Sequence, residues 1–176
     1  MDYKIDQLGT KHWYKKGQPH RGDGPAIEHS NGDKFWYKEG KLHRIDGPAI
    51  DYINGYKCWY KEGKEHRLDG PAIEYADGNK VWYKEGKLHR TDGPAVEDDN
   101  VGKFWYKEGL YHREDGPAIE WVSGDKEWFI EDKRHRIDGP AVEDADGDKL
   151  YYYLGTEINC SSNEKYFKLL KLKAFW

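Results

Sequence analysis

A period of 23 residues governs the sequence. A Trp, a His-Arg pair and an Asp-Gly-Pro-Ala tetrad each recur at this step, and the tetrads hold six of the seven prolines. Self-similarity at a fixed period of this length is the signature of a repeat protein, in which each unit packs mainly against its neighbours. The unit reads G-x-K-x-W-Y-K-E-G-K-L-H-R-x-D-G-P-A-I-E-Y-x-x and occurs about seven times. The repeated aromatic positions are Trp13, Trp36, Trp59, Trp82, Trp105, Trp128 and Tyr151.

Each unit carries two turn signals. The first is Asn-Gly, Asp-Gly or Ser-Gly between apolar runs, as at Asn54-Gly55, and it is typical of a hairpin whose turn residues accept positive φ. The second is the longer run Glu-Gly-Lys-Leu-His-Arg-x-Asp-Gly, closed by a Pro that lacks an N–H and therefore suits the start of a strand. We therefore expect two strands per unit, for example Ala49–Ile53 and Tyr56–Glu62.

The length of the short turn sets which side chains face each other. A two-residue turn would place Ile50 opposite Trp59 and Ala49 opposite Tyr60. A three-residue loop would shift this register and exchange the neighbours. Because a single hairpin is barely stable, the hairpins should stack into an elongated all-β array of about fourteen strands, roughly 65 Å long at the usual strand spacing.

The C-terminal segment departs from the repeat. Ser161 and Glu164 have the spacing of a capping box, with Ser161 as N-cap and Glu164 at N3. The stretch Lys165–Trp176 alternates lysines with apolar residues and predicts a short amphipathic helix that covers the open edge of the last hairpin. We therefore divide the chain into a hairpin array over 1–155 and a helical cap over 156–176.

Composition favours an ordered protein inside the cell. Aromatic residues make up 15 % of the chain, which predicts a thin core dominated by aromatic rings. The two cysteines, Cys58 and Cys160, do not form a repeated framework, and the N-terminus lacks the layout of a signal peptide, so we expect a reducing, cytoplasmic location. With a net charge of −4 and a cationic tail, the array itself is acidic, and we expect no nucleic-acid partner. Membrane binding is also not expected.

The unit resembles the MORN repeat. Tyr37, Gly40 and His43 keep the aromatic-x-x-Gly-x-x-His spacing of that family, and the resemblance extends over roughly residues 3 to 155. After the His, this chain continues Arg-x-Asp-Gly-Pro-Ala where MORN units usually continue Gly-x-Gly, a variant similar to repeats in phage, giant-virus and antitoxin-like proteins. The resemblance implies a hairpin scaffold for protein interaction and, if the chain is viral, an inhibitor of a host defence protein acting in the host cytoplasm.

Three repeated patterns could suggest chemistry, but each has a simpler structural reading. His-Arg-x-Asp occurs six times without a Gly-rich loop, which favours an Arg–Asp bond within the long turn over kinase chemistry. The repeated His residues would lie roughly 10 Å apart, too far for one metal ion. The repeated carboxylates should pair with lysines across the strands. We therefore expect no enzyme activity, catalytic residue, metal or cofactor. These carboxylates and lysines are Glu28, Asp51, Glu74, Glu97, Glu120 and Glu143, and Lys34, Lys57, Lys80, Lys103, Lys126 and Lys149.

The best functional hypothesis is a non-enzymatic scaffold that binds a protein. Tyr, Trp and Arg are the residues enriched at interface hot spots, and residues 98–130 depart most from the consensus, although ordinary drift would explain that too. An alternative is binding of anionic lipid or another polyanion through the Lys-rich tail. Strand edges could also pair two copies into a homodimer. The predicted partner-binding residues are Tyr37, Tyr60, Tyr83, Tyr106, Trp121, Trp128, Arg44, Arg67, Arg90 and Arg113.

Overall fold

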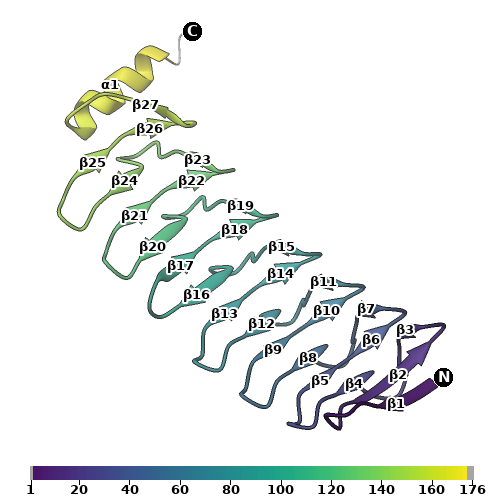
Figure 1. Cartoon of the computed structure of the whole chain (residues 1–176). Helices are drawn as coiled ribbons and strands as arrows, with labels where there is room; N and C mark the ends of the chain where they lie inside the picture. The colour runs from purple at the N-terminus through teal and green to yellow at the C-terminus, as the bar shows by residue number, and fades with distance from the viewer. Residues whose placement is uncertain (1, 174–176) are drawn as a thin grey trace. The chain divides into compact units, whose positions relative to one another are not determined.

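The computed structural model describes residues 2–173 and confirms an all-β array of hairpin repeats followed by a C-terminal helix (Figure 1). The chain divides into two compact units, unit 1 (Met1–Leu88) and unit 2 (His89–Trp176). In each unit, most strands are two residues long and pair antiparallel with the strands before and after them in the sheet. Each unit is described separately below.

The sheet of unit 1 is built in chain order from its repeats, so every strand pairs with sequence neighbours. The strand β3 (Gln18–Pro19) pairs with β2 outside this order. The ordered strands are β1 (Asp2–Ile5), β2 (Lys11–Lys15), β4 (Ile27–Glu28), β5 (Lys34–Phe35), β8 (Ile50–Asp51), β9 (Lys57–Cys58), β12 (Ile73–Glu74) and β13 (Lys80–Val81).

The sheet of unit 2 follows the same plan, with longer strands near its start. Its strands are β16 (Val96–Asp98), β17 (Gly102–Phe104), β20 (Ile119–Trp121), β21 (Lys126–Glu127), β24 (Val142–Glu143) and β25 (Lys149–Leu150). Gly102 is required inside β17, because a Cβ at this position would overlap the carbonyl oxygen of Glu120 on β20.

A second, smaller hairpin in each repeat was not predicted. The expected return strand Tyr56–Glu62 is interrupted at Trp59, and its second half, β10, turns back onto β11. The turn residues Glu62 and Gly63 both have positive φ, which is the type I′ geometry of a two-residue hairpin. The repeat therefore contains four short strands instead of two. The small hairpins are β6 (Tyr37–Lys38) with β7 (Lys41–Leu42), β10 (Tyr60–Lys61) with β11 (Lys64–Glu65), β14 (Tyr83–Lys84) with β15 (Lys87–Leu88), β18 (Tyr106–Lys107) with β19 (Leu110–Tyr111), β22 (Phe129–Ile130) with β23 (Lys133–Arg134), and β26 (Tyr152–Tyr153) with β27 (Thr156–Glu157).

The Asn-Gly turn has three residues, so the facing expected for a two-residue turn is wrong. Ile50 lies opposite Cys58, and the backbone of Tyr52 bonds that of Tyr56 across the loop. Gly55 takes the left-handed conformation with φ 97°, as the third residue of such a loop commonly does. The three-residue alternative therefore holds.

The centre of each repeat is an alanine and not an aromatic ring. The Ala of every Asp-Gly-Pro-Ala tetrad is fully buried. Its backbone can bond the segments on both sides, as when the Ala49 N–H donates to Cys58 O and Ala49 O accepts from the Trp36 N–H. Most aromatic side chains are only half-buried, which corrects the expectation of an aromatic core. The alanines are Ala26, Ala49, Ala72, Ala95, Ala118 and Ala141.

The C-terminal helix α1 (Asn163–Lys173) packs on the last hairpin. Tyr166 is fully buried against Tyr151 and Ile158, and its hydroxyl lies within hydrogen-bonding distance of two backbone carbonyls, of which Tyr152 O is 3.0 Å away. The N-cap is Ser162, whose hydroxyl accepts from the Lys165 N–H at 3.3 Å, so the predicted cap at Ser161 is wrong by one residue. The predicted helical residues Phe175 and Trp176 lie outside the described residues.

We predict that Glu62→Asn stabilises unit 1. Glu62 has φ 53° in a type I′ turn, where Asn is the favoured residue. The free energy of unfolding should rise by about 0.5–1 kcal/mol, part of the roughly 1–2 kcal/mol that the left-handed conformation costs an ordinary residue. Chemical denaturation measures this, with Lys64→Asn, outside the left-handed region, as the matched control. A loss of stability in Glu62→Asn would contradict the turn assignment.

Candidate functional site

An arginine ties each long loop to its own repeat. The Arg67 guanidinium lies 4.0 Å from the Trp59 ring centroid, its Nε donates to Asp69 Oδ1 at 2.9 Å, and one terminal nitrogen donates to both Pro71 O and Glu74 Oε1. The predicted Arg–Asp bond is present, but as a single hydrogen bond, because the terminal nitrogen is directed to Pro71 and Glu74. The predicted site residues Arg44, Arg67, Arg90 and Arg113 all hold loops in this way, and about a fifth of each side chain is exposed.

The repeated histidines connect one repeat to the next. His66 Nδ1 accepts a hydrogen bond from the Glu85 N–H at 3.1 Å, and the Glu85 carboxylate lies 3.1 Å from the same nitrogen. His20, His43, His89 and His135 make the same bond. His112 does not make this bond, and its buried Nδ1 has no hydrogen-bond partner. The turn after it contains Asp132 in place of Gly, and the Asp132 carboxylate accepts from the Tyr111 N–H. Within residues 2–173, no group of three or more potential ligands is arranged to hold a metal ion.

The repeated carboxylates form their ion pairs mainly with the loop arginines and not with the lysines opposite them in the sheet. Glu74 lies opposite Lys80 in the sheet, as predicted, but its ion pair at 2.9 Å is with Arg67. The same Arg–Glu pair forms in four other repeats, at distances from 2.7 to 3.3 Å. The expectation that lysines neutralise these carboxylates is therefore largely wrong, because the stacked Arg is already held beside the Glu in five of the repeats.

Strand alternation divides the predicted partner-binding residues of each unit between the two opposite faces of its sheet. Phe35 and Tyr37 lie on one face and Trp36, with its stacked Arg44, on the other. Tyr60 follows the same rule and lies beside Cys58. In unit 1 the structure therefore places Tyr37, Tyr60 and Tyr83 on one face, and Arg44 and Arg67 on the face of the long loops. In unit 2 it places Tyr106 and Trp121 on one face, and Trp128, Arg90 and Arg113 on the face of the long loops.

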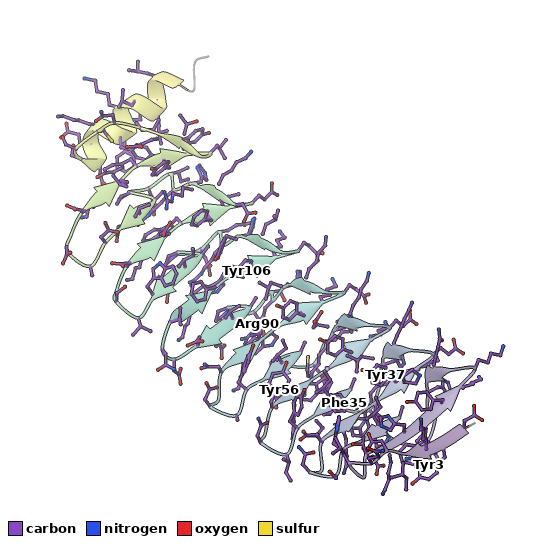
Figure 2. The ribbon with its side chains drawn as sticks, in the orientation of Figure 1. Tyr3, Phe35, Tyr37, Tyr56, Arg90 and Tyr106 are labelled. Atoms are coloured by element: carbon purple, nitrogen blue, oxygen red, sulfur yellow. The ribbon has the colours of Figure 1, made fainter. Side chains whose placement is uncertain are left out.

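In unit 1 the first face forms a continuous apolar surface, which we call the aromatic face. Its central row is set by the strand register, with Phe35 opposite Ile50, Ile50 opposite Cys58 and Cys58 opposite Ile73. Tyrosines lie on both sides of this row, and Figure 2 labels Phe35, Tyr37 and Tyr56 in this part of the chain. The aromatic face comprises Phe35, Tyr37, Ile50, Tyr52, Tyr56, Cys58, Tyr60, Ile73, Tyr75, Val81 and Tyr83.

The tyrosines beside the Asn-Gly turns were missed by the sequence analysis. Their rings form a row in contact with Phe35. The ring centroids of Phe35 and Tyr52 are 5.5 Å apart, those of Tyr52 and Tyr56 are 5.5 Å apart, and those of Tyr56 and Tyr75 are 5.4 Å apart. Steeply inclined pairs of this kind are favourable, because the positive edge of one ring meets the negative face of the next. The Tyr before the turn in the consensus unit could have indicated this row of rings. Which rings it contacts, however, depends on the length of the turn.

Burial keeps the side chains of the aromatic face uncharged. Cys58 is fully buried, and desolvation raises the pKa of its thiol to about 11, so it remains a neutral thiol. Desolvation likewise raises the pKa of Tyr56 and Tyr60, and the Tyr60 hydroxyl donates to Glu65 at 2.7 Å. This face therefore offers apolar contact and hydrogen-bond donors, but no nucleophile.

A groove opens at the turn side of the aromatic face. It has a volume of about 500 Å³, and its walls are the rings of Tyr52, Tyr56 and Tyr75. Ile50, Asn54, Ala76 and Asp77 complete the lining. Other grooves of about 720–760 Å³ lie between successive long loops on the opposite face, where Ile45 and Leu68 are highly exposed.

In unit 2 the corresponding face is interrupted by a charged pair. Glu127 occupies the row position of Phe104, opposite Ile119 and Val142, and it binds Arg134 Nε and a terminal nitrogen, each at 2.9 Å. Arg134 also lies 5.9 Å from the ring centroid of Phe129. These departures from the consensus therefore compensate one another within one hairpin.

The sequence matches no protein-family model and no curated protein. The resemblance to the MORN repeat therefore stays a prediction. In the described part of the chain, no helix is long and apolar enough to cross a membrane. Phe167, Leu169 and Leu172 are exposed on α1, and binding of anionic lipid through this segment also stays a prediction.

We predict that Glu127→Val alone destabilises unit 2, whereas Glu127→Val with Arg134→Leu does not. The single change leaves a partly buried guanidinium without its carboxylate, at a cost of about 1–3 kcal/mol, while the double change restores the apolar row. A double-mutant cycle by chemical denaturation measures the coupling. If Glu127→Val is as stable as the unchanged protein, the pair contributes nothing.

We predict that stability falls as the pH drops below about 4. The Arg67 hydrogen bond lowers the pKa of Asp69 from its usual 3.8, and Arg44 does the same for Asp46. Because these pKa values are lower in the folded state, the stabilisation is complete above the unfolded value and is lost as the pH falls through the folded one. The pKa of His135, lowered from 6.5 by burial, causes a separate loss on acidification below about 6.5.

The double substitution Asp46→Asn and Asp69→Asn tests the origin of the acid loss. Asn still accepts from the Arg Nε but does not titrate, so the curve of unfolding free energy against pH should be flatter below about 4. The loss near 6.5 should stay unchanged. An unaltered slope below 4 would show that these carboxylates do not govern acid unfolding.

Proposed function

We propose that the protein is a non-enzymatic scaffold that binds another protein through the aromatic face of unit 1. The observation that carries this proposal is the set of half-exposed tyrosines on one face of the sheet, with Tyr75 43 % exposed. Tyrosine contributes large contact area at a small cost in side-chain entropy and is enriched at interface hot spots. The neutral state of these side chains also suits an interface, since little charge has to be desolvated on binding.

The repeat architecture supports the same proposal. Successive hairpins place equivalent side chains at regular steps, which offers a partner an extended row of contacts instead of one enclosed pocket. Differences between repeats, such as Cys58 and Tyr56 in one and Val81 and Asn79 in the next, would then give the row its specificity.

A pull-down from a lysate of the encoding organism tests the proposal. The tagged chain is compared with Tyr75→Ala/Tyr83→Ala on the aromatic face and with the control Ile45→Ser/Leu68→Ser on the long loops. We expect a near-stoichiometric partner that the control retains and the aromatic-face variant loses. Thermal unfolding of all three chains establishes that they are folded. Capture that depends only on Ile45 and Leu68, or no capture at all, would contradict the proposal.

A further inference from the structure

The two turn edges of unit 1 have opposite charge. The Asn-Gly edge, residues 29–33, 52–56 and 75–79, contains Asp33 and Asp77 and neither Lys nor Arg. The Glu-Gly edge, at the tips of the small hairpins, carries eight lysines against Glu39, Glu62 and Glu85. The groove lined by Tyr52, Tyr56 and Tyr75 opens at the acidic edge. The lysines are Lys15, Lys16, Lys38, Lys41, Lys61, Lys64, Lys84 and Lys87.

The ring geometry makes this groove concave. The planes of Tyr52 and Tyr56 are inclined at 53° and those of Tyr56 and Tyr75 at 69°, so the rings form walls and not a flat stack. A volume of about 500 Å³ accommodates the end of a long side chain. The π-face of each ring carries negative partial charge and attracts a cation that lies within about 6 Å of its centroid.

A carboxylate stands at the rim of the groove. Asp77 is exposed, and its oxygens accept from the Asn79 backbone and side-chain N–H groups, which hold the carboxylate in place beside the turn. Among the residues that the structure describes, Asp77 has no Lys or Arg partner. Its charge is therefore available to a cation that comes from outside the chain.

We propose that this groove binds a cationic side chain, Arg or Lys, from a basic segment of the partner protein. The proposal rests on the proposed function, since it specifies the partner chemistry for the same aromatic face. The three rings contact the cation and its alkyl stem, and Asp77 provides the counter-charge. An anionic ligand is disfavoured by the same features, because both the ring faces and the carboxylate would repel it.

The test uses a fluorescent peptide with Gly-Ser-Arg repeated three times, and the same peptide with citrulline in place of Arg. Citrulline keeps the shape of Arg but is neutral. We expect anisotropy titrations to show binding of the Arg peptide and at least fivefold weaker binding of the citrulline peptide. Binding should weaken further at about 150 mM salt, where the Debye length is about 8 Å.

Matched variants locate the binding site. Tyr75→Leu keeps an apolar side chain but removes the ring, and Asp77→Asn removes the charge, so each should weaken binding of the Arg peptide roughly fivefold. The control Asp69→Asn also removes one carboxylate, but from a loop on the other face where Arg67 already pairs with it, and it should leave the affinity unchanged. Circular dichroism and thermal unfolding establish that each variant is folded.

The outcomes separate this inference from the scaffold proposal. Equal binding of the Arg and citrulline peptides, or equal weakening by Asp77→Asn and Asp69→Asn, would overturn the cation site even if the pull-down captures a partner through Tyr75 and Tyr83. Selective loss in Tyr75→Leu and Asp77→Asn supports the site, and it does so even if the lysate yields no partner.

Discussion

The stacking of an arginine on a tryptophan is the contact on which each repeat depends. A single-layer sheet of two-residue strands buries little apolar surface, so the long loop between the small hairpin and the next strand, for example residues 66–72, needs another anchor. Arg67 provides one by covering Trp59 and bonding the loop at Asp69 and Pro71 and the strand at Glu74. This clamp holds the loop against the sheet from one side.

Because of this clamp, the two faces of the sheet use their aromatic side chains differently. One face uses its aromatic rings internally, and an Arg covers the Trp ring in five of the repeats, at Trp13, Trp36, Trp59, Trp105 and Trp128. The other presents tyrosines that are held by ring–ring contacts and by hydrogen bonds such as that from Tyr60 to Glu65. A partner that contacts the second face would not have to displace any of the bonds that stabilise the repeat.

Departures from the consensus are of two kinds. Glu127 and Arg134 both differ from the consensus and pair with each other, so each provides the counter-charge of the other. The groove at Tyr52, Tyr56 and Tyr75 is different, because its ring contacts are internal but its carboxylate at Asp77 has no cationic partner in the described chain.

The sequence by itself determined the 23-residue period, the hairpins and the helix at the C-terminal end, because turn residues and apolar patterns act over a few neighbouring positions. Tertiary structure decided the rest. One additional residue in the Asn-Gly loop placed Ile50 opposite Cys58 instead of Trp59 and so set which rings meet. Glu74 forms its ion pair with Arg67 and not with the lysine opposite it in the sheet, and the equivalent Glu residues also pair with a loop Arg. Such choices depend on the reach of side chains between strands, which spacing along the chain does not fix.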